Sequence, residues 1–445
     1  MNGTTEGTRP SDEKESDGEP PKPPDPFHVP SYKHLLQFPE ILPGTKTTPS
    51  GSRDVTVPII DGIIVPTVRS AEQVNAAVEL ALRARCQLVT LYTDETPPEL
   101  SPVLDRFARG MAAPLAVPSG IRHHLLDLAG DLPQGLVSAA ALDISRKRNL
   151  GLIIGRACGW TRMLFLDDDI RKLSVGKLSS AAALLDDYPV VGLQVNKYPD
   201  ASVVGHARRL TGRRQEPFIS GGSLLVNPQL IKGFFPPTYH EDWLCIVNHL
   251  RLREVAIGGT VGQVPYQPFT TPQRARLEEF GDILLAGLLW LVHARHGENA
   301  ADPNREYWHE ATTPCFWREI LNQRAALLET TANRLNRLNP HPLPSLEAAQ
   351  QRCRELAPEE FVSFTKKWLI NLAAWDYRLS LLPRADSVPQ ALAELGLSRL
   401  VRGQEARSRR DPARQTRWTG GFVGRWPAAP GPIPAARAQE FANSA

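Results

Sequence analysis

Three consecutive aspartates, Asp167, Asp168 and Asp169, directly follow a short apolar run. Adjacent carboxylates repel one another, and a hard divalent cation can neutralise such a group. Because alternate side chains of an extended backbone point the same way, Asp167 and Asp169 are predicted to hold one metal ion between them. The ligands are oxygens, so the predicted ion is Mn²⁺ or Mg²⁺. The structural alternative is an Asp-rich turn or the start of a helix.

A second acidic pair, Glu241 and Asp242, lies between Tyr239 and Trp243 and precedes a helical run of apolar residues. Carboxylates at a helix start have a structural explanation, because they interact favourably with its free N–H groups. In an enzyme, a carboxylate can also take the proton of an attacking hydroxyl group. The residues alone leave both interpretations open.

The elements that would position these side chains follow from the apolar patterning. Strand, helix and strand are predicted at 61–67, 71–85 and 86–93, and this βαβ order requires a parallel sheet. The apolar run ending at Leu166 is predicted to be a buried central strand. Further strands are expected at 190–195 and 222–226, and helices at 145–158, 277–294, 314–328, 346–356 and 359–382. The expected fold is an α/β, Rossmann-like, mostly parallel sheet followed by a helical C-terminal region.

In the order of its motifs, the chain resembles the GT-A fold glycosyltransferases, and among them glycosyltransferase family 2. The resemblance covers residues 60–295. It rests on the strand 63–67, Thr93-Asp94, Arg148-Asn149, the DxD element 167–169, and the segments 219–223 and 239–243. The resemblance implies a GT-A fold and a metal-dependent transfer of a sugar from a nucleoside-diphosphate sugar to an unidentified hydroxyl acceptor, with inversion at the anomeric carbon.

The resemblance also implies residues that bind the nucleotide of the donor. Pro66, Thr67 and Asp94 would hold its base and ribose, and Arg148 would lie near the base or the diphosphate. For Asp94 the structural alternative is a turn residue that ends a strand. For Arg148 the structural alternative is a surface charge on a helix. We expect the neighbouring residues 146–147 to be solvated surface charges of this kind.

The acidic residues receive roles from the same resemblance. Asp167 would face the ribose or the water shell of the metal, Asp168 would belong to the donor-binding residues, and Asp169 would bind the metal that bridges the diphosphate. Asp242 would be the catalytic base, with Glu241 as an orienting neighbour or acceptor contact.

Several other residues have structural interpretations that we favour. Arg274 and Glu278 are expected to pair within one helix, and His240 is expected to be packed or solvated beside Glu241. The tryptophans of the C-terminal region are predicted to be core residues: Trp308, Trp317, Trp368 and Trp375.

Three alternative functions remain open. A retaining GT-A glycosyltransferase would use the pair at 241–242 only to bind substrate. A sugar nucleotidyltransferase would normally show a Gly-rich basic signature after the first strand, and the segment 66–70 contains no glycine. A non-catalytic scaffold that binds a nucleotide would not need intact carboxylates at both positions.

Composition sets wider limits on function. The 51 Lys and Arg residues nearly balance the 48 Asp and Glu residues, a formal charge of +3 that argues against a general nucleic-acid binder. The longest apolar run, 283–292, is too short to span a bilayer. The five cysteines form no close pair, so we expect a reducing compartment and a cytoplasmic protein.

The chain of 445 residues is long enough for more than one folded unit. Residues 1–52 are acidic and Pro-rich and 401–445 are basic and rich in Pro, Ala and Arg, and both segments are predicted to be disordered. The expected folded parts are a catalytic domain at 53–295 and a helical region at 296–400.

Overall fold

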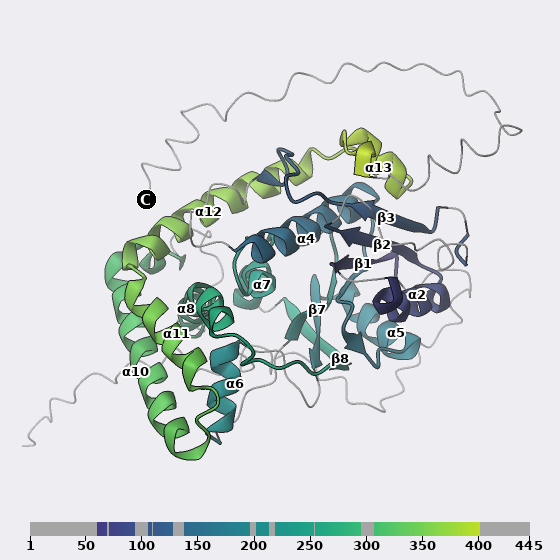
Figure 1. The fold of residues 1–445 in the computed structure, drawn as a ribbon. Helices are drawn as coiled ribbons and strands as arrows, with labels where there is room; N and C mark the ends of the chain where they lie inside the picture. Colours follow the sequence, from purple (N-terminus) through teal and green to yellow (C-terminus); the bar gives the residue numbers. More distant parts are fainter. Residues whose placement is uncertain are drawn as a thin grey trace, which may run out of the picture.

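The computed structural model describes residues 60–68, 71–93, 106–108, 110–127, 138–195, 202–212, 219–252, 254–294 and 307–400. These residues form a mixed α/β structure with a helical C-terminal region (Figure 1). The predictions made for Asp94 and for the segments 1–52 and 401–445 lie outside the described residues.

One eight-stranded sheet, in the order β3-β2-β1-β4-β7-β6-β8-β5, forms the centre of the structure. Strands β1 to β4 are parallel to one another, β7 is antiparallel to both β4 and β6, β6 is parallel to β8, and β5 is antiparallel to β8. The strands are β1 (Gly62–Thr67), β2 (Gln87–Tyr92), β3 (Ala112–Ala116), β4 (Met163–Leu166), β5 (Ile170–Arg171), β6 (Val190–Val195), β7 (Ile219–Val226) and β8 (Val255–Gln263).

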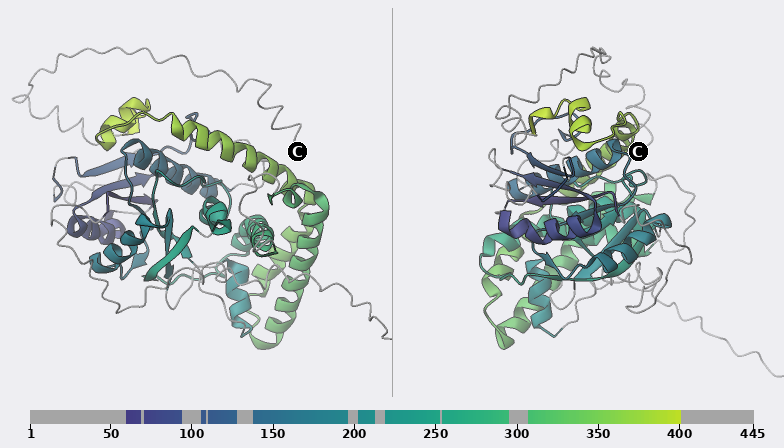
Figure 2. Two further views of the ribbon diagram at one scale, coloured as in Figure 1. Left: turned by 180° about the vertical axis from the view of Figure 1, so that it is seen from behind. Right: turned by 90° about the vertical axis from the view of Figure 1, so that its right-hand side faces the viewer.

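Helices cover both faces of the parallel strands, as their apolar residues require. Figure 1 shows α2 and α5 on one side of β1 and β2, and α4 on the other. Helices α10 to α12 lie beside the sheet, and α12 leads back over α4 to α13 (Figure 2). The α-helices are α2 (Ala71–Ala84), α4 (Ala139–Ala157), α5 (Val175–Ala183), α6 (Val203–Leu210), α7 (Glu241–Arg251), α8 (Pro272–Ala294), α10 (Pro314–Leu338), α11 (Leu343–Glu355), α12 (Pro358–Ser380) and α13 (Val388–Glu394).

The order of the first four strands creates a switch point in the sheet. The chain builds β1, β2 and β3 outward in one direction and then places β4 on the other side of β1. Parallel α/β sheets bind ligands beyond the carboxyl ends of the strands at such a reversal. Thr67 ends β1 and Asp167 follows β4, so both residues lie at this edge.

The strands and helices predicted from the sequence are found, with shifted ends. Helix α4 begins at Ala139 rather than 145, and the Ser138 hydroxyl caps it by accepting from the Ala141 N–H at 3.1 Å. Strands β3 and β8 were not predicted. Strand β3 contains Ala and Pro rather than branched residues, and β8 is interrupted by Gly258 and Gly259.

The C-terminal helices pack through aromatic residues. Trp308, Trp317, Trp368 and Trp375 are all buried, which confirms their assignment to the core. Among the described helices, none is long and apolar enough to cross a membrane.

Candidate active site

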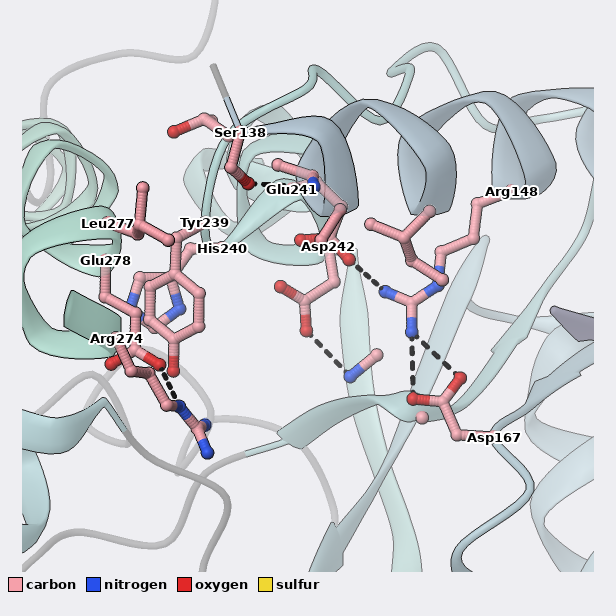
Figure 3. A pocket seen from close by; sticks show the side chains of 16 residues that line it. Ser138, Arg148, Asp167, Tyr239, His240, Glu241, Asp242, Arg274, Leu277 and Glu278 are labelled. Atoms are coloured by element: carbon pink, nitrogen blue, oxygen red, sulfur yellow. Dashed lines mark hydrogen bonds and ion pairs between the residues drawn. The ribbon is translucent and has the colours of Figure 1, made fainter. Parts of the chain in front are cut away.

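A cavity of about 370 Å³ lies beyond the carboxyl end of β4, between α4, β7, α7 and α8 (Figure 3). Four carboxylates and two guanidinium groups contribute to its lining, so the lining carries an excess of acidic groups. The charged and aromatic residues that line it are Arg148, Asp167, Tyr239, His240, Glu241, Asp242, Arg274 and Glu278.

Arg148 connects the two acidic sites that the sequence singles out. Its Nη2 lies 3.0 and 3.1 Å from the two carboxylate oxygens of Asp167, and its Nη1 donates to Glu241 Oε1 at 2.5 Å. The Arg148 side chain is only 4% exposed, which rules out the surface-charge interpretation. A buried arginine therefore bridges β4 and the start of α7 (Figure 3).

The pKa values of this group follow from its burial. Burial alone would lower the pKa of Arg148, but the charges of Asp167 and Glu241 outweigh it and raise the pKa. Burial raises the pKa of Glu241 to about 7, against the opposing charge of Arg148. The pKa of Glu241 is therefore above its ordinary value, while Arg148 stays charged.

Asp242 is held by two backbone N–H groups. Its Oδ2 accepts from Gly221 at 2.7 Å, and its Oδ1 accepts from Trp243 at 2.8 Å. A Cβ on Gly221 would lie 2.5 Å from the Asp242 Cβ, so glycine is required at this contact. The Glu241–Asp242 pair occupies the first turn of α7 and also lines the cavity, so a helix-start role and a cavity role coexist.

The three consecutive aspartates diverge to different partners. The Ile170 N–H donates to the Asp167 carbonyl at 3.2 Å, which closes a turn. The extended backbone assumed for Asp167–Asp169 is therefore wrong, and the alternative of an Asp-rich turn is confirmed. Asp168 accepts from Thr67 Oγ1 at 2.6 Å, and Asp169 accepts from Gln263 Nε2 at 3.3 Å.

The metal assignment rests on ligand type and not on a preformed cluster. Among the described residues, no group of three or more His, Cys, Asp or Glu side chains is arranged to hold a metal ion. The hard oxygen donors and the acidic excess of the cavity fit a divalent cation. Asp167 is the predicted ligand that faces the cavity, whereas Asp169 is not among the lining residues.

Lys147 organises the carboxyl ends of β1 and β2. Its Nζ donates to the Thr67 carbonyl at 2.8 Å, to Thr93 Oγ1 at 2.5 Å and to Asp143 Oδ2 at 2.7 Å. Lys147 and its neighbour Arg146 are both buried, so the prediction that they are solvated is wrong. Both residues lie on α4, whose residues 145–155 are all buried in the middle of the structure.

The remaining predicted donor residues lie near the switch point but outside the large cavity. Pro66 is buried within β1, and Thr67 is directed to Asp168. A smaller cavity of about 70 Å³, on the α2 side, is lined by Asp167, Asp168 and Arg171 among others. Asp167 thus contributes to both cavities, because it lies where they approach one another.

The α8 side of the cavity contains two residues with structural partners. Arg274 Nε donates to Glu278 at 2.7 Å, which confirms their intrahelical pairing. Burial raises the pKa of Glu278 to about 7, although Arg274 opposes the shift. His240 Nε2 lies 2.8 Å from Asp282 Oδ1. No local sequence signal links His240 to Asp282, since they come from different helices.

A comparison of the chain with known proteins finds no matching protein-family model and no matching curated sequence.

Proposed function

We propose that this chain is a glycosyltransferase with a GT-A fold, which transfers a sugar from a nucleoside-diphosphate sugar to a hydroxyl acceptor with inversion. The observation that carries the proposal is that Asp167 and Asp242, from distant parts of the sequence, line one cavity beside the switch point of the sheet. Arg148 and Glu241 connect them through buried ion pairs.

The donor nucleotide would bind at the carboxyl ends of β1 and β4. This edge brings together Thr67, Asp168 and the Lys147 ammonium group. A hydroxyl and a carboxylate can recognise the hydroxyl groups of a ribose. The general preference of α/β sheets for ligands at this edge supports the placement.

Asp242 is suited to accept the proton of the acceptor hydroxyl. Each of its oxygens accepts one backbone N–H, and a carboxylate offers further lone pairs beyond these two. As Asp242 takes the proton, the acceptor oxygen forms a bond to the anomeric carbon. The bond from that carbon to the diphosphate oxygen breaks, and the nucleoside diphosphate leaves with the electron pair.

The proposed Mn²⁺ or Mg²⁺ ion would be held by Asp167, which lines the cavity, and Asp169 would have to turn away from Gln263 to become the second ligand. When bound, it would neutralise charge on the diphosphate. Arg148 keeps Asp167 in position and offsets part of the surrounding negative charge. The cytoplasmic location stays a prediction from the cysteine composition.

The variant Asp242→Asn tests the proposal. We expect it to bind a nucleoside-diphosphate sugar as the unchanged chain does, but to lose transfer by about 10²-fold or more. The control is Asp186→Asn, because Asp186 pairs with Arg162 at the surface. An active Asp242→Asn protein would remove Asp242 as the base. Proton NMR of fresh product would separate inversion from retention.

A further inference from the structure

A buried ionic group lies directly behind the cavity. Arg324, on α10, donates to the two oxygens of Glu279 at 2.7 and 2.6 Å and to Asp282 Oδ2 at 2.8 Å. The three side chains are 0–7% exposed. A buried ionic group of this kind is often no more stabilising than apolar side chains of the same size. We therefore expect this ionic group to contribute to the geometry of the neighbouring site and not to stability alone.

The second oxygen of Asp282 extends this group to the cavity. Asp282 Oδ1 lies 2.8 Å from Nε2 of His240, a residue of the cavity lining. Burial would raise the pKa of Asp282, but Arg324 and His240 lower it to about 2. Asp282 is thus a carboxylate shared between a C-terminal helix and the loop that enters α7.

His240 has a backbone conformation that needs support. Its φ of +66° and ψ of +32° lie in the left-handed region, which is uncommon for residues other than glycine. His240 directly precedes Glu241 and Asp242, so its conformation sets the direction in which the first turn of α7 presents them. Such a conformation persists when surrounding contacts determine it.

Helix α8 also contacts the preceding residue through its backbone. A Cβ on Gly281 would lie 2.3 Å from the carbonyl oxygen of Tyr239, so only glycine allows this approach. The segment Tyr239–His240 is therefore fixed by two adjacent residues of α8: Gly281 by close packing and Asp282 by a hydrogen bond.

We propose that Arg324 and Asp282 are positioning residues, which act through His240 to hold Asp242 in its catalytic orientation. Neither Arg324 nor Asp282 lines the cavity, so their effect on the reaction is indirect. The expected effect on kcat rests on the proposed function. The expected effect on the position of Asp242 can be measured without any substrate. Through Arg324 on α10, the helical C-terminal region would then contribute to the reaction at the carboxyl edge of the sheet.

The test compares Asp282→Ala with Asp282→Asn in the full chain. Asparagine keeps an oxygen that can accept from His240, whereas alanine removes it. We expect Asp282→Ala to lower kcat by about 10²-fold with little change in donor Kd, since small displacements of a reacting group have effects of this size. Asp282→Asn should recover only part of this loss, because its amide keeps an acceptor for His240 but turns a donor toward Arg324.

The matched control is Glu254→Gln at the other end of α7. Glu254 lies 2.7 Å from Nδ1 of the buried His249, a second histidine–carboxylate pair away from the cavity, in which the carboxylate is more exposed than Asp282. Glu254→Gln should leave kcat unchanged. An unchanged kcat in folded Asp282→Ala, or an equal loss in Glu254→Gln, would overturn the proposal.

Amide hydrogen exchange distinguishes this proposal from the proposed function. If no donor gives turnover with the unchanged chain, the proposed function fails. Faster exchange at residues 241–243 in Asp282→Ala, but not in Glu254→Gln, would still support the positional role, and unchanged exchange would overturn it.

If Asp282→Ala does not fold, His240→Gln and His240→Ala replace the pair, because glutamine can still donate to Asp282. Slower exchange at 241–243 in His240→Gln than in His240→Ala supports the role, and equal exchange overturns it.

Discussion

Arg148 Nη2 lies 3.0 Å from Asp167 Oδ1 and 3.1 Å from Asp167 Oδ2, in a place where the arginine is almost completely buried. The same guanidinium donates to Glu241. One cation therefore joins the two acidic motifs of the sequence and keeps carboxylates from β4 and α7 close together. This arrangement explains how a site rich in carboxylates can form inside the fold.

Replacing Arg148 should destabilise the protein. Arg148→Met leaves the largely buried Glu241 and the partly exposed Asp167 without their shared cation, and the loss of one partner of a buried ion pair costs about 3–5 kcal/mol. Urea unfolding measures the change. The control Arg106→Met breaks an exposed pair with Glu79 and should cost less than about 1 kcal/mol. Equal stability of the two variants would contradict the bridging role of Arg148.

The metal assignment predicts a loss of cation-dependent binding. Asp169→Ala should abolish the Mn²⁺-dependent part of nucleoside-diphosphate binding in calorimetry, because Asp169 is a proposed ligand. Chelation of the metal should have the same effect on the unchanged chain. The surface variant Asp186→Asn serves as the control. Mn²⁺-dependent binding that survives in Asp169→Ala would remove this residue from the metal site.

Gly221 should tolerate no side chain. A Cβ there would lie 2.5 Å from the Asp242 Cβ and 2.6 Å from Arg148 Nη1, so Gly221→Ala must displace one of them. We expect a destabilisation of about 1–3 kcal/mol and a loss of transfer. Gly120→Ala is the matched control, because its Cβ would meet nothing within 4 Å. Full activity of Gly221→Ala would show that the Asp242 position is not critical.

Glu278 should make stability depend on pH. Burial raises its pKa from 4.5 to about 7, so between these values the folded protein keeps a proton that the unfolded chain has released. The free energy of unfolding should therefore fall as pH rises through this window, by about 3 kcal/mol.

Glu278→Gln should remove the contribution of Glu278 to this dependence, while that of Glu241, whose pKa is also raised, stays. As pH rises through the window, the Tm of the unchanged chain should fall relative to the Tm of the variant. Glu347→Gln, which changes an exposed residue of α11, should show no such trend. A difference that does not vary with pH would contradict the raised pKa.

Much of the sheet could be predicted because its strands are buried on both faces. The run that became β4 is apolar throughout and the run that became β1 is apolar up to Thr67, and the aspartates after β4 were expected at the sheet edge, where Asp167 lies. Strand β8 could not be predicted, since Gly258 and Gly259 interrupt its pattern. The α/β class and the helical C-terminal region are confirmed, whereas the GT-A assignment remains a proposal.

The partners of the site residues could not be predicted from local patterns. Lys147 was expected to be solvated because basic residues usually mark an exposed helix face, but α4 is buried around this position. Asp282 contacts His240 only because α8 packs against the start of α7. Such contacts depend on the tertiary arrangement, which short-range spacing does not contain.

The most direct test of the proposed glycosyltransferase is a thermal-shift screen of nucleoside-diphosphate sugars with the full chain, with and without Mn²⁺. A ligand that binds only the folded state raises Tm, by an amount that grows with the logarithm of its concentration above Kd. We expect at least one donor to raise Tm in the presence of Mn²⁺ and much less in its absence. If no nucleoside diphosphate or sugar donor raises Tm at millimolar concentration, the central claim is contradicted.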